Sequence, residues 1–204
     1  MKTREPALAS FGHERDEVRS MMSFRAAFEF YIRAKEAVVA AGFASELDWQ
    51  ERLVLERVTE QDFLREQAWV VLSSGMRGTV VAGVFGEISA AFRGWDVARI
   101  REDVEGCSSR ALNAFCHPGK INAIAENCRL VVDLGLESIK RELRKEGPFW
   151  LTRLHYIGPV TCWHLAKNLG LDVVKPDRHL VRMAQASGVM DTTRLCEVFA
   201  DATG

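Results

Sequence analysis

Two short stretches of the chain carry residues whose types and spacing suit chemistry beside a nucleic-acid backbone. The first, Leu154–Cys162, reads Leu-His-Tyr-Ile-Gly-Pro-Val-Thr-Cys and predicts a tight turn that opens a helix at Gly158. The second, Val174–Leu180, places Asp177 nineteen residues later, at the start of another helix. A helix N-terminus attracts phosphate because its first N–H groups are unpaired and partly positive. A carboxylate nearby suits general-base or electrostatic work.

The turn has the residues that a phosphate-binding hairpin needs. Gly158 has no side chain, so a nucleic-acid backbone can come close to it. Pro159 falls at the first helical position, where its missing N–H costs nothing. We expect the backbone N–H groups of Ile157, Gly158 and Val160 to contact phosphate, and the Ile157 side chain to pack inward and tie two helices together. An ordinary helix–turn–helix corner is the alternative.

Asp177 is predicted to cap a helix. Pro176 disfavours helical dihedral angles at Lys175, so the helix begins no earlier than Asp177 and runs over Arg178–Ala186. Aspartate is among the best N-caps and contributes about 1 kcal/mol there. A capping carboxylate is also held rigidly, as a catalytic group must be. Capping alone is the alternative interpretation.

Together the hairpin and the aspartate resemble the helix-hairpin-helix DNA glycosylases, the superfamily that includes endonuclease III and the alkylbase and 8-oxoguanine glycosylases. Residues 176–182, Pro-Asp-Arg-His-Leu-Val-Arg, match the family's Val-Asp-x-His-Val/Leu-x-Arg. The family hairpin reads Leu-Pro-Gly-Val/Ile-Gly, and this chain has His155 and Tyr156 in place of Pro-Gly. The resemblance covers residues 60–188 in helix order and is specific at residue level over 154–182.

The resemblance implies an all-α fold of two helical lobes around a central cleft. One lobe would combine residues 1–58 with 148–204 and hold the helix-hairpin-helix, about 148–170. The other would span residues 59–147. Asp177 would be the catalytic residue, stabilising the cation-like sugar and positioning water as the N-glycosidic bond breaks. The target base must first leave the stack of double-stranded DNA.

The resemblance also predicts which product forms. Enzymes of the family that cut the strand as well carry a lysine two residues past the last hairpin glycine, and this chain has Val160 there. Valine cannot form an imine, so the resemblance implies a monofunctional glycosylase that leaves an abasic site. Lys167 and Lys175 are the alternative lysines, although phosphate contacts or solvated charges suit them better.

Further site residues follow from the same resemblance. In the family, the turn between two apolar helices of the other lobe carries the side chain that fills the gap left by the flipped base, a role that Met76 or Arg77 would take here. A plain connector is the alternative. The expected DNA contacts are Ile157, Gly158, Val160, Thr161, Lys175, Met76 and Arg77. The expected base pocket comprises His164, Tyr156, Trp69 and Gln67. The alternatives are a core position for Trp69, a surface or capping position for His164, and a core position or a DNA contact for Tyr156.

Helical periodicity along the whole chain predicts the elements that position these residues. Thr59-Glu60-Gln61-Asp62 is a capping box before one such helix, and Gly42 is expected to end the first. Leu171–Val174 is too isolated to build a sheet. The predicted helices are 24–41, 60–73, 79–92, 96–104, 107–115, 120–134, 137–145, 148–154, 159–169, 178–186 and 192–200.

Composition favours a cytoplasmic globular protein. Of the 204 residues 48% are hydrophobic and 27% are charged, and no apolar run approaches the roughly 18 residues of a membrane span. The five cysteines are scattered without Cys-x-x-Cys spacing, which argues against a disulfide framework, a zinc site or an iron–sulfur cluster. We therefore expect no metal or cofactor, except that a monovalent cation at the hairpin is compatible with the sequence. We also expect a monomer.

The charge of the chain leaves other functions open. A net charge of −1 is low for a nucleic-acid-binding protein, but residues 148–188 hold five Lys or Arg against two Asp. The alternatives are a non-catalytic helix-hairpin-helix DNA-binding protein, a helical interaction protein, and a glycosylase directed at hypermodified foreign (phage) DNA. The sequence does not determine which base is excised, because selectivity depends on pocket shape and a few polar groups.

Overall fold

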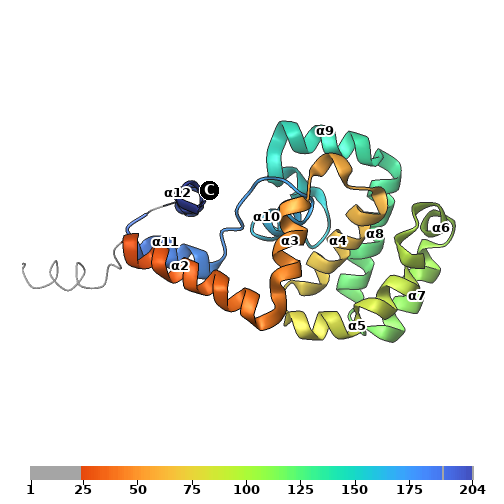
Figure 1. The fold of residues 1–204 in the computed structure, drawn as a ribbon. Coiled ribbons are helices and arrows are strands. Elements are labelled where there is room, and N and C mark those ends of the chain that lie inside the picture. Colours follow the sequence, from red (N-terminus) through yellow and green to blue (C-terminus); the bar gives the residue numbers. More distant parts are fainter. Residues whose placement is uncertain (1–23, 190, 204) are drawn as a thin grey trace, which may run out of the picture. The chain divides into compact units, whose positions relative to one another are not determined.

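The computed structural model describes residues 24–189 and 191–203, which form helices and turns, with no residue of these ranges in a β-strand (Figure 1). The prediction of an all-helical chain is confirmed at this level. None of these helices is both long and apolar enough to cross a bilayer. The α-helices are α2 (Phe24–Val38), α3 (Ala44–Arg52), α4 (Glu60–Ser73), α5 (Gly78–Ala91), α6 (Val97–Glu102), α7 (Val104–Ala114), α8 (Pro118–Leu134), α9 (Leu136–Glu146), α10 (Thr161–Asn168), α11 (Arg178–Ala186) and α12 (Thr192–Thr203).

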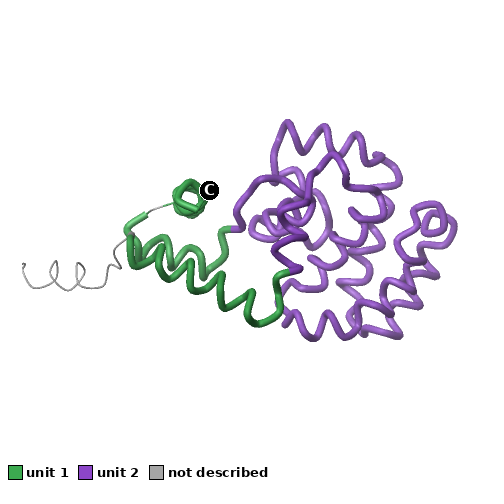
Figure 2. The backbone as a smooth tube through the Cα atoms, viewed as in Figure 1, with its two compact units in different colours: residues 1–44, 176–204 green, residues 45–175 purple. Residues whose placement is uncertain are grey.

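The chain divides into two compact units, coloured separately in Figure 2. Unit 1 combines residues 1–44 with 176–204, and unit 2 spans residues 45–175. These boundaries differ from the predicted lobes, because the hairpin segment 148–170 belongs to the same unit as the middle helices. The physical reason is packing: the 3-10 helix η4 (Gly147–Arg153) contacts α9 and α10, and α10 packs on α4.

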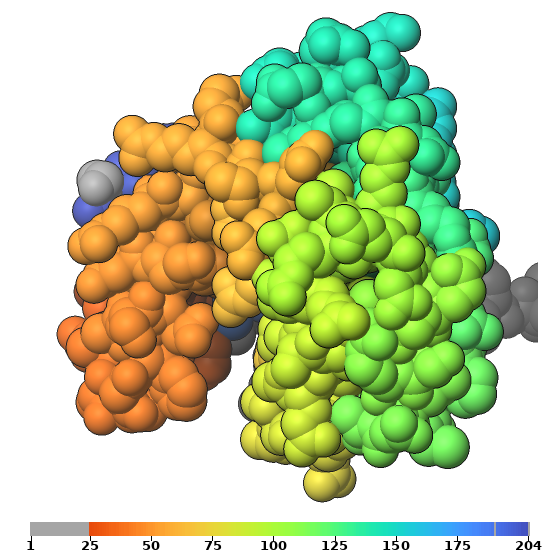
Figure 3. All heavy atoms as spheres, turned by 90° about the vertical axis from the view of Figure 1, so that its right-hand side faces the viewer, coloured from red at the N-terminus to blue at the C-terminus, as the bar shows by residue number. Residues whose placement is uncertain are grey.

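Unit 2 is built around α4 and α8, which pack on each other and supply its most buried side chains. Phe63 and Leu64 of α4 and Ile121 and Ile124 of α8 are fully buried. Helix α7 packs against α8 and α5, and Figure 3 shows side chains of α5, α6, α7 and α9 side by side on one face of this unit. Hydrophobic burial of these inward faces therefore fixes the positions of α4 and α8 within unit 2.

Helix α4 begins as predicted. The side-chain oxygen of Thr59 accepts a hydrogen bond from the N–H of Asp62 at 3.1 Å, and the Asp62 carboxylate accepts one from the N–H of Thr59 at 3.0 Å. This reciprocal capping box satisfies two of the N–H groups that a helix start leaves unpaired. It fixes the register of the helix that carries Glu66, Gln67 and Trp69.

Unit 1 has its own small core. Ala27 of α2, Ala184 of α11, and Leu195 and Phe199 of α12 are buried together. The Phe199 ring lies 5.1 Å from the Tyr31 ring, measured between centroids. These contacts hold α11, and with it the residue that caps α11, within this unit.

The largest difference from the predicted elements is α3, which the sequence did not indicate. Gly42, with a φ of +88°, interrupts the helical path within a π-helical turn at residues 39–43, and the chain then continues into α3. None of the α3 side chains is buried. Because the apolar residues of α3 are only Ala44, Leu47 and Trp49, they do not form the repeated apolar stripe from which periodicity could identify a helix.

Candidate functional site

The hairpin turn adopts glycine-type geometry without a glycine. The N–H of Ile157 donates to the carbonyl of Leu154 at 3.2 Å and closes a turn with His155 and Tyr156 at its centre. Tyr156 has a φ of +65°, in the left-handed region. A side chain there costs roughly 1–2 kcal/mol. Tyr156 thus has a left-handed backbone conformation at the position where the resembled sequence pattern has glycine.

The hairpin N–H groups are not all available to a ligand. Ile157 packs inward as predicted, with 4% of its surface exposed. Its N–H is used in the turn, and the N–H of Gly158 donates to the side-chain oxygen of Thr161 at 2.7 Å. Helix α10 begins at Thr161 rather than at Pro159, which makes Val160 the residue before the helix. A phosphate therefore reaches the Gly158 N–H only when the Thr161 hydroxyl rotates away.

Two buried side-chain amides form hydrogen bonds to each other and to the backbone of the hairpin. Gln67 and Asn127 are fully buried, and Asn127 Nδ2 donates to Gln67 Oε1 at 2.9 Å and to the carbonyl of His155 at 3.1 Å. Gln67 in turn donates to the carbonyl of Leu64 at 3.0 Å. The prediction that Gln67 lines a base pocket is corrected here, since its amide is consumed in supporting the hairpin and has no exposed surface.

The hairpin and the turn after α4 both lie against the first turn of α8. The Tyr156 ring meets the His117 ring edge-on, with 6.3 Å between centroids. Lys120, only 3% exposed, donates from Nζ to the carbonyls of Leu72 at 2.5 Å and Ser74 at 2.6 Å. A cation at the end of a helix complements its dipole. The two segments predicted to contact DNA are thus anchored to one common element.

The turn itself presents Arg77 to solvent, as the residue that precedes α5. Met76 is half-buried and packs against the core of unit 2. Neither residue lines the cavity that contains His164. Their predicted role in filling the gap left by a flipped base stays a prediction, as does their pairing with His164 across one cleft.

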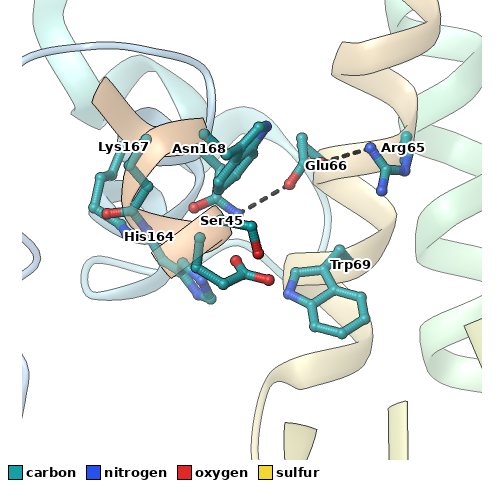
Figure 4. Close-up of a pocket in the computed structure, with 10 residues that line it drawn as sticks. Ser45, Arg65, Glu66, Trp69, His164, Lys167 and Asn168 are labelled. Carbon is teal, nitrogen blue, oxygen red and sulfur yellow. Dashed lines mark hydrogen bonds and ion pairs between the residues drawn. The ribbon is translucent and has the colours of Figure 1, made fainter. Parts of the chain in front are cut away.

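A surface cavity of about 530 Å³ lies within unit 2, among α3, α4 and α10. Figure 4 shows Glu66 and Trp69 on the α4 side and His164, Lys167 and Asn168 on the α10 side. Two predicted pocket residues, His164 and Trp69, are therefore brought together, whereas Tyr156 lies at the hairpin with 47% of its surface exposed. The lining residues are Ser45, Glu46, Trp49, Gln50, Arg65, Glu66, Trp69, His164, Lys167 and Asn168.

The α10 side of the cavity combines a neutral imidazole with cations. Burial lowers the pKa of His164 to about 4, and the charges of Lys175 and Lys167 act in the same direction. His164 is consequently neutral at physiological pH, so one ring nitrogen can donate a hydrogen bond and the other can accept one. Burial also lowers the pKa of Lys167, with Lys175 adding to this effect and Glu46 opposing it.

Glu66 is the most buried acidic residue among the lining residues that were not predicted from the sequence. Its side chain is 11% exposed, its Oε2 accepts from Asn168 Nδ2 at 3.0 Å, and its Oε1 lies 3.6 Å from Arg65 Nη1. Burial raises the pKa of Glu66, while the Asn168 hydrogen bond and the Arg65 charge oppose this and the Asp62 charge reinforces it. An acidic residue at helical spacing from the apolar Phe63 and Val70, and therefore on the inward face of α4, was the signal that could have identified it.

Asp177 caps α11 as predicted, and it belongs to unit 1, whereas the hairpin and the cavity belong to unit 2. Its Oδ1 accepts hydrogen bonds from the N–H groups of His179 at 2.9 Å and Leu180 at 3.0 Å. Two bonds to one oxygen fix the orientation of the carboxylate. This is the rigidity that the capping position was expected to give.

Comparison with protein-family models, with curated proteins and with solved structures finds no match. Within residues 24–189 and 191–203, no three His, Cys, Asp or Glu side chains are grouped so that they could hold a metal ion. The chemistry of the site therefore has to be derived from the residues of this chain.

Proposed function

We propose that this chain is a monofunctional DNA glycosylase, which hydrolyses the N-glycosidic bond of a damaged or modified base flipped out of duplex DNA. The observation that carries the proposal is the continuity of hairpin and cavity. The turn at Tyr156 leads directly into α10, and α10 supplies one side of a cavity of about 530 Å³. Small-molecule sites span roughly 300–1,000 Å³, so an extruded base fits this space.

The hairpin supports contact with the DNA backbone rather than with base edges. Gly158 and Pro159 present no long side chain at the start of α10, and the Asn127 amide fixes the backbone just before them. Backbone contacts position a protein on DNA, while recognition of the base requires another surface. The cavity beside α10 provides that second surface.

Asp177 supplies the negative charge that glycosidic cleavage needs. The sugar becomes cation-like as the bond to the base breaks, and a rigid carboxylate stabilises that charge and orients the attacking water. The double hydrogen bond to Asp177 Oδ1 provides the rigidity. Val160, the residue before α10, has no amine, so hydrolysis and an abasic site are the expected outcome.

The experiment is a panel of duplexes, each with one defined lesion, incubated with the protein and then analysed with and without hot alkali. We expect strand breaks at one lesion or more, and only after alkali, because an abasic site is alkali-labile. Breaks without alkali would contradict the monofunctional assignment. Intact strands across the whole panel, under conditions in which the protein binds the duplexes, would contradict excision itself.

A further inference from the structure

We propose that Glu66 is the acid that protonates the departing base, and that the cavity takes neutral bases in preference to cationic ones. This inference rests on the proposed glycosylase function and assigns the substrate class of the same site. It concerns only unit 2, where Glu66, Asn168 and the cavity lie.

The two carboxyl oxygens of Glu66 have different partners, a hydrogen bond at Oε2 and an ion pair at Oε1. Asn168 Nδ2 donates to Oε2 at 3.0 Å and so fixes the plane of the carboxyl group. Arg65 lies 3.6 Å from Oε1, which is longer than a hydrogen bond. Oε1 accepts no hydrogen bond at this distance, so a proton carried on it would be donated to a ring nitrogen or carbonyl oxygen of a base in the cavity that Glu66 lines. Figure 4 marks the Arg65–Glu66 ion pair with a dashed line.

Burial favours the protonated form of the Glu66 carboxyl group over the carboxylate. With 11% of its side chain exposed, Glu66 loses most of the hydration that would stabilise the carboxylate, and burial is the largest influence on its pKa, which is raised. His164 does not replace it as the acid, because burial lowers its pKa to about 4 and leaves the ring neutral. Arg65 does not release its proton in proteins.

The charges around Glu66 favour a neutral ligand. Among the charged side chains that line this cavity and the second cavity that Glu66 borders, four are cations and two, apart from Glu66, are anions. One of the cations, Arg57, comes from the 3-10 helix η2 (Leu55–Arg57). A cationic N-alkylated purine would be repelled by this surplus, whereas negative charge that develops on a departing neutral base would be stabilised. The groups are Asp62 and Arg65 of α4, Glu46 and Arg52 of α3, Arg57 of η2, and Lys167 with neutral His164 of α10.

A neutral base is also the one that needs an acid. As the C1′–N bond breaks, its electron pair moves to the base, and the Glu66 proton neutralises the resulting anion. Water then bonds to C1′ of the sugar cation and loses a proton, and the Glu66 carboxylate regains one through solvent. A base that already carries positive charge leaves as a neutral molecule without this proton. The acid and the surplus of cations among the lining side chains therefore both favour a neutral base as the substrate.

The test is single-turnover excision by wild type, Glu66→Gln and Glu60→Gln between pH 5 and 9. Glu60 is the control because it is exposed in the first turn of the same helix. The duplexes carry hypoxanthine or 8-oxoguanine as neutral bases and 7-methylguanine as the cationic base. For the neutral base that wild type excises, we expect Glu66→Gln to slow excision at least ~100-fold and to remove the fall in rate at high pH. Excision by Glu60→Gln should be unchanged.

Wild-type kinetics by Glu66→Gln, with an unaltered pH profile, would overturn the proposal while leaving the glycosylase function intact. Preference of wild type for 7-methylguanine would overturn the assignment of the substrate class. If Glu66→Gln does not fold, Glu66→Asp keeps the acid, and the wild-type pH profile and base preference still decide the matter. Failure of wild type to excise any base would remove the proposed function together with this inference.

Discussion

The Asn127 side chain pairs with both backbone polar groups of His155. Its Oδ1 accepts from the His155 N–H at 2.7 Å, and its Nδ2 donates to the His155 carbonyl at 3.1 Å. The second hydrogen of the amide goes to Gln67 Oε1. One buried amide thus satisfies the chain where it enters the hairpin and joins it to α8 and α4, so the hairpin is held from the core.

Replacing Asn127 by leucine should destabilise unit 2 by about 2–4 kcal/mol. The change leaves the buried Gln67 oxygen and the two partly buried backbone groups of His155 without their partner. An unsatisfied buried group costs about 1–3 kcal/mol, and a partly buried group costs less because water can reach it. Urea denaturation followed by tryptophan fluorescence measures this, because all five tryptophans lie in unit 2. The control is Asn122→Leu, exposed on the same helix, which should stay within about 0.5 kcal/mol of wild type. Equal stability of the two variants would argue against the network.

Two substitutions at Tyr156 separate backbone strain from the loss of its ring. Tyr156→Gly and Tyr156→Ala both remove the contact with His117, but only glycine relieves the φ of +65°. We expect the glycine variant to be more stable than the alanine variant by roughly 1–2 kcal/mol, measured by the same denaturation. In a helix interior the order is reversed by about 0.5–1 kcal/mol. Alanine proving the more stable would mean that the turn lacks left-handed geometry in solution.

Local signals in the sequence predicted the residues whose structure depends on near neighbours. The capping box at Thr59 and the cap at Asp177 are formed by residues two or three positions away, and turn chemistry alone identifies them. Ile157 was also predicted correctly to be buried, since an apolar residue in a hairpin between two helices has the core as its one favourable environment.

Residues whose role depends on distant partners were missed or misassigned. Gln67 was expected in the pocket from the resemblance, as a residue of the helix before the turn at Met76, but its partner Asn127 is sixty residues away. Glu66 pairs with Asn168, and no short pattern relates positions so far apart. Helix α3, which lines the cavity with Trp49, has no buried side chain. Its sequence therefore has no hydrophobic periodicity from which the helix could be predicted.

Asp177→Asn should abolish excision without harming the fold. Asparagine is as good an N-cap as aspartate, so the hydrogen bonds to the N–H groups of His179 and Leu180 can persist while the charge is lost. Duplex binding should be equal or stronger, because a negative charge near phosphates is removed. The control Asp177→Ala should lose excision and also about 1 kcal/mol of helix stability, followed by circular dichroism. Wild-type single-turnover rates for Asp177→Asn would exclude this residue from the chemistry.

His164 should make unit 2 less stable in acid. Its pKa is about 4 in the folded chain against an ordinary value of 6.5, so the unfolded chain binds more protons between these values. The free energy of unfolding should therefore fall as the pH drops from 6.5 to 4, by about 3 kcal/mol at most. His164→Gln should flatten this part of the profile, while His155→Gln, with an exposed ring, should not. A profile unchanged in His164→Gln would show that the ring is solvated.

Gly158→Glu tests the hairpin without disturbing the fold. A Cβ built at Gly158 meets only Thr161 Oγ1, at an ordinary 3.9 Å, and the backbone there does not require glycine. The new carboxylate would stand where a phosphate approaches the start of α10. We expect at least ~10-fold weaker binding to damaged and undamaged duplexes alike, and a shallower dependence of affinity on salt, because a backbone contact is lost.

The matched control for the hairpin is Gly86→Glu, an exposed glycine of α5 with open space around its Cβ position. It adds the same charge to the same unit, so its binding should fall much less than that of Gly158→Glu. Thermal unfolding of both variants should match that of wild type, apart from the small gain that a helix makes when glycine is replaced. Loss of affinity confined to damaged duplexes would mean that Gly158 faces the extruded base rather than the backbone. Equal losses in the two variants would mean that the added charge, and not the hairpin, weakens binding.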